Sequence, residues 1–347
     1  MNNVSPNLKS DQSEYIEHSV QKFKMVQVFY GTDRMLGKLR TDAFYGNQRG
    51  TLAFGVCRVS IPEHHRMGEL EAPSWQKFEF HENPKKHIVL LEVTPQSEKK
   101  FIAGLRLYIH RSEENQAFVF VHGYNVSFED AARRTAQMAF DLGFDGAPIF
   151  YSWPSQGRLS AYTVDETNAE WSVPHLKEFL EMVSSKTGAK QIHLIVHSMG
   201  GRSLSAALKE IANEQGSEAP IFKEIVLAAP DIDAEVFKRD ILPRIQPIVG
   251  RITLYASSVD KALMASKMAH GNPRAGDSNS EALVVVHGMD TVDASTVDTS
   301  FLGHSYYAEN RSIISDIYLL LRTGNPPNQR NLLERYRNGD KYWTFRP

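Results

Sequence analysis

The feature that most constrains this chain is a series of short, wholly apolar segments that alternate with amphipathic ones. AFVFVHG at 117–123 precedes the helical pattern FEDAARRTAQMAFDLG at 128–143, and IHLIVHS at 192–198 precedes RSLSAALKEIANEQG at 202–216. Strands without polar alternation are typical of a parallel sheet that is covered by helices. The repeated strand-then-helix order therefore predicts an α/β fold, with a mostly parallel sheet and helices on both of its faces.

Other segments extend this pattern in both directions. The remaining predicted core elements are strands at 148–154, 224–232, 251–258 and 282–288, and a helical stretch at about 165–187. Before them, β-like runs at 25–32, 51–62 and 87–95 predict an amino-terminal β-rich extension. The stretch 266–281 is expected to be a long loop.

Composition divides the 347 residues into four expected parts. Residues 1–22 are polar and are expected to form a flexible arm, and 23–110 form a segment packed on the core. Residues 111–325 form the α/β core that carries the candidate site. Residues 326–347 are a carboxy-terminal tail, for which we expect a helix with an aromatic end.

Charge and cysteine content exclude several function classes. The formal net charge of −2 provides no electrostatic attraction for nucleic acid or an anionic membrane. The single cysteine, Cys57, cannot form an internal disulfide or a multi-thiolate metal site. The spacing of His64, His65, His81 and His87 matches no zinc pattern, so no metal is expected.

No apolar run has the length of a membrane span, and the amino-terminal residues do not resemble a secretory signal. These features predict a soluble cytoplasmic protein without stable membrane insertion.

Polar residues gather where the predicted strands end, and one of them is a serine in a glycine-rich corner. Ser198 follows a buried strand and precedes Met199, Gly200 and Gly201. A nucleophilic serine on a strand-to-helix turn needs small residues two positions before and after it. Gly200 meets this need, whereas Val196 departs from the usual glycine or alanine.

An acid and a histidine follow in the order typical of α/β-hydrolases. Asp260 comes after the strand at 251–258, and His304 lies in the loop after the last predicted strand. Asp231 and Asp233 follow an earlier strand and remain alternatives for the acid. Asp233 precedes a helical pattern, where an aspartate most often caps the helix.

A second loop is predicted to complete the site. His122 and Gly123 follow an early strand, where hydrolases place an oxyanion-binding N–H, and a glycine there allows close backbone approach. We expect the N–H groups of Met199 and Tyr124 to be the oxyanion donors. The candidate pocket-wall residues are His122, Gly123, Asn125, Trp153, Tyr162 and His197, with 156–170 as a candidate lid; packing between sheet and helix is the favoured role for His197.

Several of these motifs resemble one bacterial family. VFVHGYNVSFEDAARR, YSWPSQG, VHSMGGR, LYASSVDKAL and FLGHSYY are similar to an α/β-hydrolase family catalogued as domain of unknown function nine hundred and described as esterase- or lipase-like. VFYGTDR (28–34) and the segment 54–71 also look like its amino-terminal part. The resemblance implies an α/β-hydrolase fold with Ser198, Asp260 and His304 as a catalytic triad.

Together, the residues and the resemblance predict a serine hydrolase that cleaves a small-molecule carboxylic ester without a metal or organic cofactor. A thioesterase, an amidase or a phospholipid acyl hydrolase would use the same residues. A catalytically inactive, hydrolase-fold binding protein is the alternative from another class.

Overall fold

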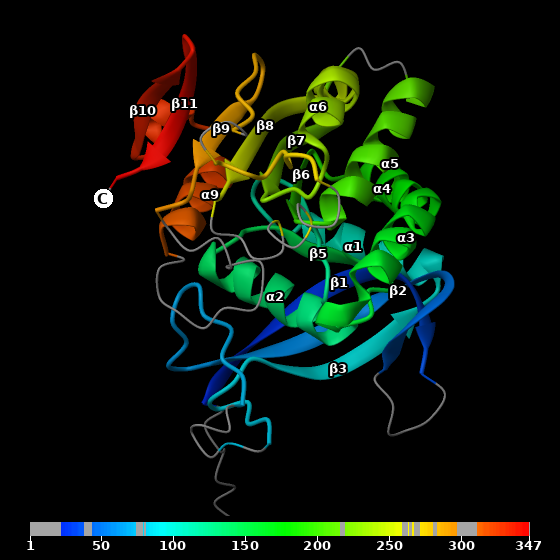
Figure 1. Cartoon of the computed structure of the whole chain (residues 1–347). Coiled ribbons are helices and arrows are strands. Elements are labelled where there is room, and N and C mark those ends of the chain that lie inside the picture. Colours follow the sequence, from blue (N-terminus) through cyan, green and yellow to red (C-terminus); the bar gives the residue numbers. More distant parts are fainter. Residues whose placement is uncertain are drawn as a thin grey trace, which may run out of the picture.

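A single sheet runs through the whole of the described chain (Figure 1). The computed structural model describes residues 22–37, 44–73, 79, 81–215, 219–258, 263, 266, 271–279, 283–296 and 311–346. The sheet has 11 strands in the order β10-β11-β9-β8-β7-β6-β4-β5-β1-β2-β3. Strand β6 is therefore the central strand, with five strands on each side.

The middle of this sheet is parallel, as the apolar segments predict. Its parallel strands are β4 (Gln116–Val121), β5 (Ala147–Ser152), β6 (Gln191–His197), β7 (Phe222–Ala228), β8 (Val249–Ala256) and β9 (Asp290–Asp293). Every residue of β4 and β5 is buried. Because the parallel strands run in one direction, all of their carboxyl ends lie at one edge of the sheet, where an α/β protein collects its reactive groups.

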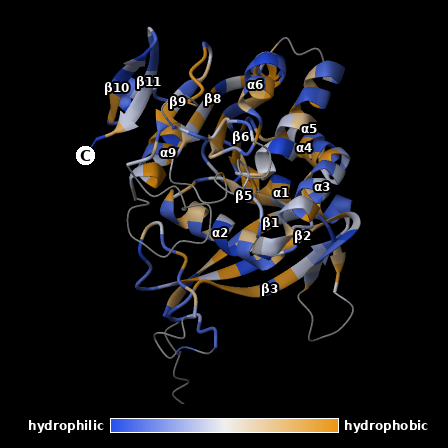
Figure 2. Ribbon diagram, viewed as in Figure 1, coloured by the Kyte–Doolittle hydropathy of each residue, from blue (hydrophilic) through white to orange (hydrophobic). Residues whose placement is uncertain are grey.

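Helices cover both faces of the sheet, and each face has its own apolar core. One face is covered by α1 (Glu98–Ile109), α4 (Val173–Lys186), α5 (Gly200–Gln215) and the helical turns from α6 (Ala234–Val236) to α7 (Leu242–Ile245). The other face is covered by α2 (Phe128–Asp141) and α9 (Arg311–Thr323). Figure 2 shows hydrophobic residues following the strands, with hydrophilic residues on the outer turns of α5 and α6. The predicted fold class is confirmed.

The amino-terminal strands belong to this same sheet. β1 (Phe23–Leu36) pairs in parallel with β5 and antiparallel with β2 (Tyr45–Pro62), which pairs with β3 (Val89–Gln96). In the parallel pair, Thr32 lies opposite Ser152. The end of β1 thus reaches the same edge of the sheet as the ends of the core strands.

The structure corrects the predicted tail helix. After a short turn at Pro327–Gln329, the chain forms the hairpin β10 (Leu332–Arg337) and β11 (Asp340–Phe345). Asn338 and Gly339 form its two-residue turn, with φ of 50° and 88°. An Asn-Gly pair between alternating strands favours a hairpin, because both central residues of this turn need positive φ. Trp343 pairs with Val292 of β9, so the tail extends the sheet.

Two other elements differ from the prediction. Helix α1 was not predicted, although Ser97 caps it and Phe101, Leu105 and Ile109 are buried along one face. The predicted strand at 282–288 is wrong: the described residues 283–288 are not in a strand, and β9 follows at Asp290–Asp293. Val284 is buried in the core under one face of the sheet instead of extending the sheet.

None of the helices in the described ranges is both long enough and apolar enough to cross a membrane.

Candidate active site

Ser198 lies on a sharp corner between β6 and α5. Its φ is +49°, in the left-handed region that residues other than glycine seldom adopt. Neighbouring backbone groups hold this conformation: the Ser198 N–H donates to Ala228 O at 3.0 Å, and the Ser198 carbonyl accepts from Gly201 N at 2.9 Å and Asp231 N at 3.1 Å. Such strain persists only where surrounding contacts enforce it, and it is the feature expected of a nucleophile elbow.

Two glycines allow the backbone to close around this serine. A Cβ on Gly123 would lie 2.8 Å from His197 Nδ1 and 3.0 Å from Ser198 Cβ. A Cβ on Gly200 would overlap the carbonyl oxygen of His122. The loop after β4 therefore lies directly against the serine. Val196 is completely buried, and the strained corner forms with valine at that position.

The loop from His122 to Val126 is held by polar side chains of the β5–α3 segment. Asp165, on α3 (Tyr162–Trp171), accepts from Asn125 N at 3.2 Å, and Ser155 Oγ accepts from Val126 N at 3.1 Å and donates to Asp165 at 2.6 Å. Asp165 is fully buried, and burial raises its pKa against the opposing effect of these hydrogen bonds. Asn125 has φ of +58°, so the loop, like the elbow, has a constrained backbone.

The end of this loop is also fixed by the start of α2. Ser127 and Asp130 form a reciprocal capping box, in which each side chain accepts from the other residue's N–H. The carboxyl-terminal part of the loop is thus anchored by the local capping box and by Asp165 and Ser155, which are distant in sequence.

The candidate wall residues divide into two groups. His122 and Trp153 are fully buried and stack with ring centroids 5.0 Å apart, while Trp153 Nε1–H donates to His122 O at 2.8 Å. Tyr124 and Tyr162 meet edge to face at 5.4 Å and are only partly buried. His197 turns its ring toward Gly123, next to the loop.

Asp231 lies in a buried polar cluster beside the elbow. It is 1% exposed, and its carboxylate accepts from Tyr162, Ser266, Arg274 and Arg202. Burial and the Asp231 charge raise the pKa of the Tyr162 hydroxyl, so the tyrosine remains a donor. Two arginines therefore compensate this carboxylate.

Asp233 has a structural role and caps a helix. Its side chain accepts from Glu235 N and Val236 N, both at 3.0 Å, and so caps α6. The prediction that Asp233 caps a helix is confirmed. Asp260 and His304, the predicted acid and base, lie outside the described residues.

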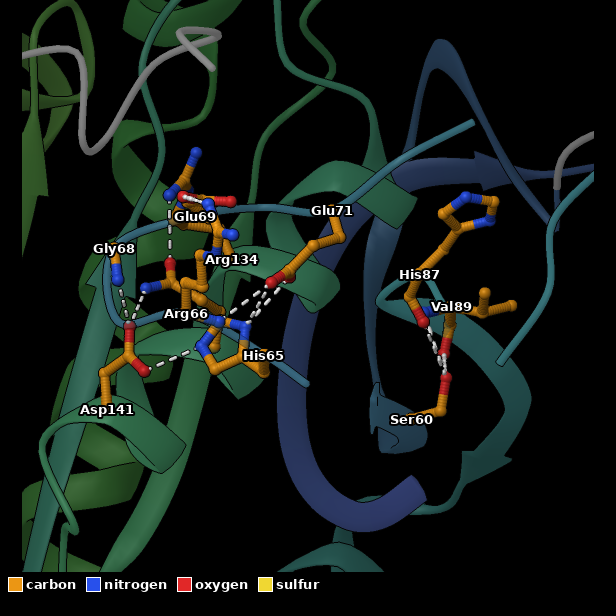
Figure 3. Close-up of polar contacts among 11 residues, drawn as sticks. Ser60, His65, Arg66, Gly68, Glu69, Glu71, His87, Val89, Arg134 and Asp141 are labelled. Atoms are coloured by element: carbon orange, nitrogen blue, oxygen red, sulfur yellow. Dashed lines mark hydrogen bonds and ion pairs between the residues drawn. The ribbon is translucent and has the colours of Figure 1, made fainter. Parts of the chain in front are cut away.

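Two of the four histidines tested against zinc spacings, His65 and His87, have carboxylate partners, and Figure 3 shows those of His65. His65 Nδ1 lies 2.8 Å from Glu71 and its Nε2 lies 2.8 Å from Asp141. His87 Nε2 lies 3.0 Å from Glu79. Within the described ranges, no three His, Cys, Asp or Glu side chains are arranged to hold a metal ion.

Comparison with protein families fits the elbow geometry. The model of a family described as "alpha/beta hydrolase of unknown function (DUF900)" matches residues 97–322. The chain belongs to this family. For DUF900 members the description names the fold and leaves the reaction open. The match begins at α1, so β1, β2 and β3 lie outside it.

Individual relatives of this DUF900 hydrolase are distant. The uncharacterized protein alr1448 of Nostoc sp. is 29% identical over 143 residues, which are 34% of this chain and 37% of that protein. The chain thus spans little more than a third of this curated relative.

Two solved structures are also similar, each at 12% identity. The acylaminoacyl peptidase of Pyrococcus horikoshii aligns over 90% of this chain and 44% of its own, with a TM-score of 0.37. A putative cell surface hydrolase of Lactobacillus plantarum aligns over 62% of this chain and 94% of its own, with a TM-score of 0.34.

Sequence reasoning did not find the residues that hold the loop after β4. Asp165 lies in the stretch 156–170 considered as a lid, Ser155 lies in the YSWPSQG motif just before it, and Arg34 lies in the amino-terminal VFYGTDR motif. The signal in the sequence was the run of three consecutive polar residues Thr32, Asp33 and Arg34 after the apolar part of VFYGTDR. The structure buries all three.

Proposed function

We propose that this protein is a serine hydrolase that cleaves a carboxylic ester through an acyl-enzyme. The observation that carries the proposal is the positive φ of Ser198 at the β6–α5 corner, with the Gly123 loop against its side chain. A strained serine at the carboxyl edge of a parallel sheet, next to a loop that offers N–H groups, is the arrangement of acyl-transfer hydrolases.

The reaction follows from these roles. His304 takes the proton from Ser198 Oγ as the oxygen attacks the ester carbonyl, and Asp260 stabilises the resulting imidazolium. The N–H groups of Met199 and Tyr124 bind the oxyanion of the tetrahedral intermediate. The C–O bond to the alcohol then breaks, and the alcohol leaves with the proton from His304. Water attacks the acyl-enzyme in the same way and releases the acid.

The surroundings of Ser198 support Met199 as a donor. In the part of the chain that the structure describes, the Met199 N–H donates to no other group. It lies at the amino-terminal end of α5, where the helix dipole favours a developing negative charge. Each such donor lowers the barrier by roughly 3 kcal/mol in other serine hydrolases.

Labelling with a fluorophosphonate, which phosphonylates activated serines, tests the proposal. We expect a single label that peptide mapping assigns to Ser198 and that is absent from Ser198→Ala. Ser203→Ala is a matched control, because Ser203 is buried one turn further along α5 and bonds Gly200 O. Folded wild-type protein without a label, or a label that persists in Ser198→Ala, would exclude a serine hydrolase.

A panel of soluble acyl esters, thioesters and amides identifies the substrate class. We expect turnover of short- to medium-chain esters in solution. Faster turnover of a thioester or amide with the same acyl group would assign the protein to that class instead.

A further inference from the structure

Arg34 lies before the segment that the family model matches. Its side chain nevertheless reaches the loop after β4, beside the candidate active site. Arg34 lies near the end of β1, a strand that runs beside β5 (Figure 1) and pairs with it as far as Thr32 and Ser152. Its side chain is 2% exposed. Burial lowers its pKa to about 10 against the effect of Asp33 and Asp165, so the guanidinium is charged at neutral pH.

All five N–H groups of this guanidinium have acceptors. Nε donates to Ser152 Oγ at 2.8 Å, Nη1 to Gly46 O at 3.1 Å and Ser155 O at 3.0 Å, and Nη2 to Val126 O at 2.7 Å and His122 Nε2 at 3.4 Å. A buried arginine whose five guanidinium N–H groups all donate hydrogen bonds is held in one orientation. Arg34 therefore joins β1, the β5 end and the loop after β4 as one rigid unit.

These contacts define the protonation of His122. Nδ1 lies 2.8 Å from Gly123 O, which can only accept, so Nδ1 carries the hydrogen. Nε2 is then the acceptor, for Arg34 Nη2 and for Ser152 Oγ at 3.1 Å. Burial and the nearby Arg34 charge lower the pKa of His122 well below its usual range, which keeps the ring neutral.

The neutral ring in turn orients one peptide group. His122 Nδ1–H holds the carbonyl oxygen of Gly123. In a trans peptide the N–H of the next residue points opposite to that carbonyl, and the next residue is Tyr124. The direction of the Tyr124 N–H therefore depends on His122, and the direction of His122 depends on Arg34 and Ser152.

We propose that Arg34 is a positioning residue that, through His122, holds the Gly123–Tyr124 peptide with its N–H turned away from the His122 ring, in the direction from which it would bind the oxyanion. This inference rests on the proposed serine-hydrolase function. It assigns a role in that reaction to the amino-terminal strands: they supply the group that keeps the oxyanion loop in its working orientation.

The effect of losing Arg34 is a defect in turnover. In Arg34→Met the Gly123–Tyr124 peptide can rotate, and loss of one oxyanion donor typically lowers kcat by about 10²–10³-fold. KM for a soluble ester is expected to remain within about threefold, because this donor acts mainly in the transition state. Arg34→Lys replaces five directed donors by a point charge and is expected to lie between Arg34→Met and the wild type.

Two further variants separate positioning from stability. His122→Phe keeps the ring on Trp153 but removes Nδ1–H, so it is expected to lower kcat as strongly as Arg34→Met. Arg330→Met is the control, since Arg330 is also buried and, among the described residues, its side chain bonds Asp316 and Tyr255 instead of the loop. It is expected to lower stability while kcat stays within about threefold of the wild type.

The experiment combines ester kinetics, fluorophosphonate labelling and hydrogen exchange of the loop peptide 122–127 in the full chain. We expect Arg34→Met to lower kcat and the labelling rate together and to speed exchange in the loop, and Arg330→Met to do none of these. If folded Arg34→Met is labelled at the same rate as the wild type and its loop exchanges at the same rate, the proposal is overturned. An equal kcat loss in Arg330→Met would also overturn it.

The failure of the proposed function has a different signature. Unlabelled, inactive wild-type protein excludes the serine hydrolase and with it the catalytic purpose of Arg34. Hydrogen exchange still decides in that case whether Arg34 holds the loop, because this readout needs no activity.

Discussion

Gly123 is a residue at which the loop after β4 packs directly against Ser198. A side chain there must displace either His197 or Ser198, since its Cβ would lie 2.8 and 3.0 Å from their atoms. Glycine is therefore required at position 123 because the loop after β4 and the corner at Ser198 lie so close together.

We expect Gly123→Ala to lower ester turnover at least tenfold, because sub-ångström shifts of an oxyanion donor are costly. It should lower the free energy of unfolding by about 1–3 kcal/mol, as overpacking does. Urea unfolding and ester kinetics measure the two effects. Gly104→Ala is the control: its Cβ would meet nothing nearer than Phe29 at 4.0 Å, and alanine favours helix α1. Unchanged turnover in Gly123→Ala would contradict the close approach.

Replacing Asp231 or Asp260 by asparagine should have opposite effects: the first change should lower stability, and the second should lower turnover. Asp231→Asn leaves Arg274 buried without its carboxylate, so the free energy of unfolding should fall by about 3–5 kcal/mol. Asp260→Asn should leave stability near the wild type and lower turnover by up to about 10⁴-fold, as in serine proteases. Thermal unfolding and kinetics of both variants test this. Normal turnover in Asp260→Asn, with activity abolished in folded Asp231→Asn, would assign the acid to Asp231.

At the scale of elements, the segment after β2 is fastened to the end of α2 by one histidine (Figure 3). The side chain of His65 is 3% exposed and lies between Glu71 and Asp141, while Asp141 also accepts from Gly68 N at 2.7 Å. Burial lowers the pKa of His65, but the hydrogen bonds and charges of Asp141 and Glu71 outweigh it and raise the pKa from 6.5 to about 9.

The raised pKa gives the sign of a pH dependence. The stabilisation is complete below about pH 6.5 and is lost as pH rises through about 9, because the folded state binds the proton more tightly. It corresponds to roughly 3 kcal/mol in total. We expect the free energy of unfolding to fall between pH 7 and 10 in the wild type and to vary less in His65→Gln. Equal slopes for the two proteins over that range, measured by urea unfolding, would contradict the imidazolium contact.

Most strands of the parallel core could be predicted from sequence because they are mainly apolar, as β4 and β5 are. Strand β9 could not, because its four residues include two aspartates. The tail could not be predicted in the same way, since its alternating residues were interpreted as a helical end although Asn338-Gly339 favours a hairpin. Helix α1 was missed because Phe101, Leu105 and Ile109 form a narrow stripe among charged residues. The elbow and Gly123 were predictable from local motifs, whereas the role of Arg34 was not: Gly46 is 12 residues away, but the other partners of the guanidinium lie 88 to 121 residues away.

At the scale of the whole molecule, the amino-terminal strands are structural parts of the sheet. β1 lies between β5 and β2, and Val28, Tyr30, Cys57 and Val59 belong to the core on the α2 side. Removing β1–β3 would uncover the edge of β5 and the apolar face beneath it.

We expect a chain that begins at residue 97 to be insoluble or to unfold at much lower urea concentration than the full chain, because an exposed apolar strand edge promotes aggregation. A chain that begins at residue 22 keeps every strand and is the matched control. Soluble expression and urea unfolding of both report the result. Cooperative unfolding of the 97–347 chain at the midpoint of the full chain would show that the family segment is independent.

The position of β1 also has a consequence for how the chain acquires its fold. β1, β2 and β3 pair with their neighbours in sequence, so this meander can form as soon as they leave the ribosome. The edge of β1 that pairs with β5 stays unpaired until β5 has been synthesised, and Ser152 of β5 is 120 residues beyond Thr32. Such distant pairings are slow because a long loop must close first. For that interval of synthesis the nascent chain carries an unpaired β1 edge, and a folding chain with such an edge is prone to aggregate until β5 pairs with it.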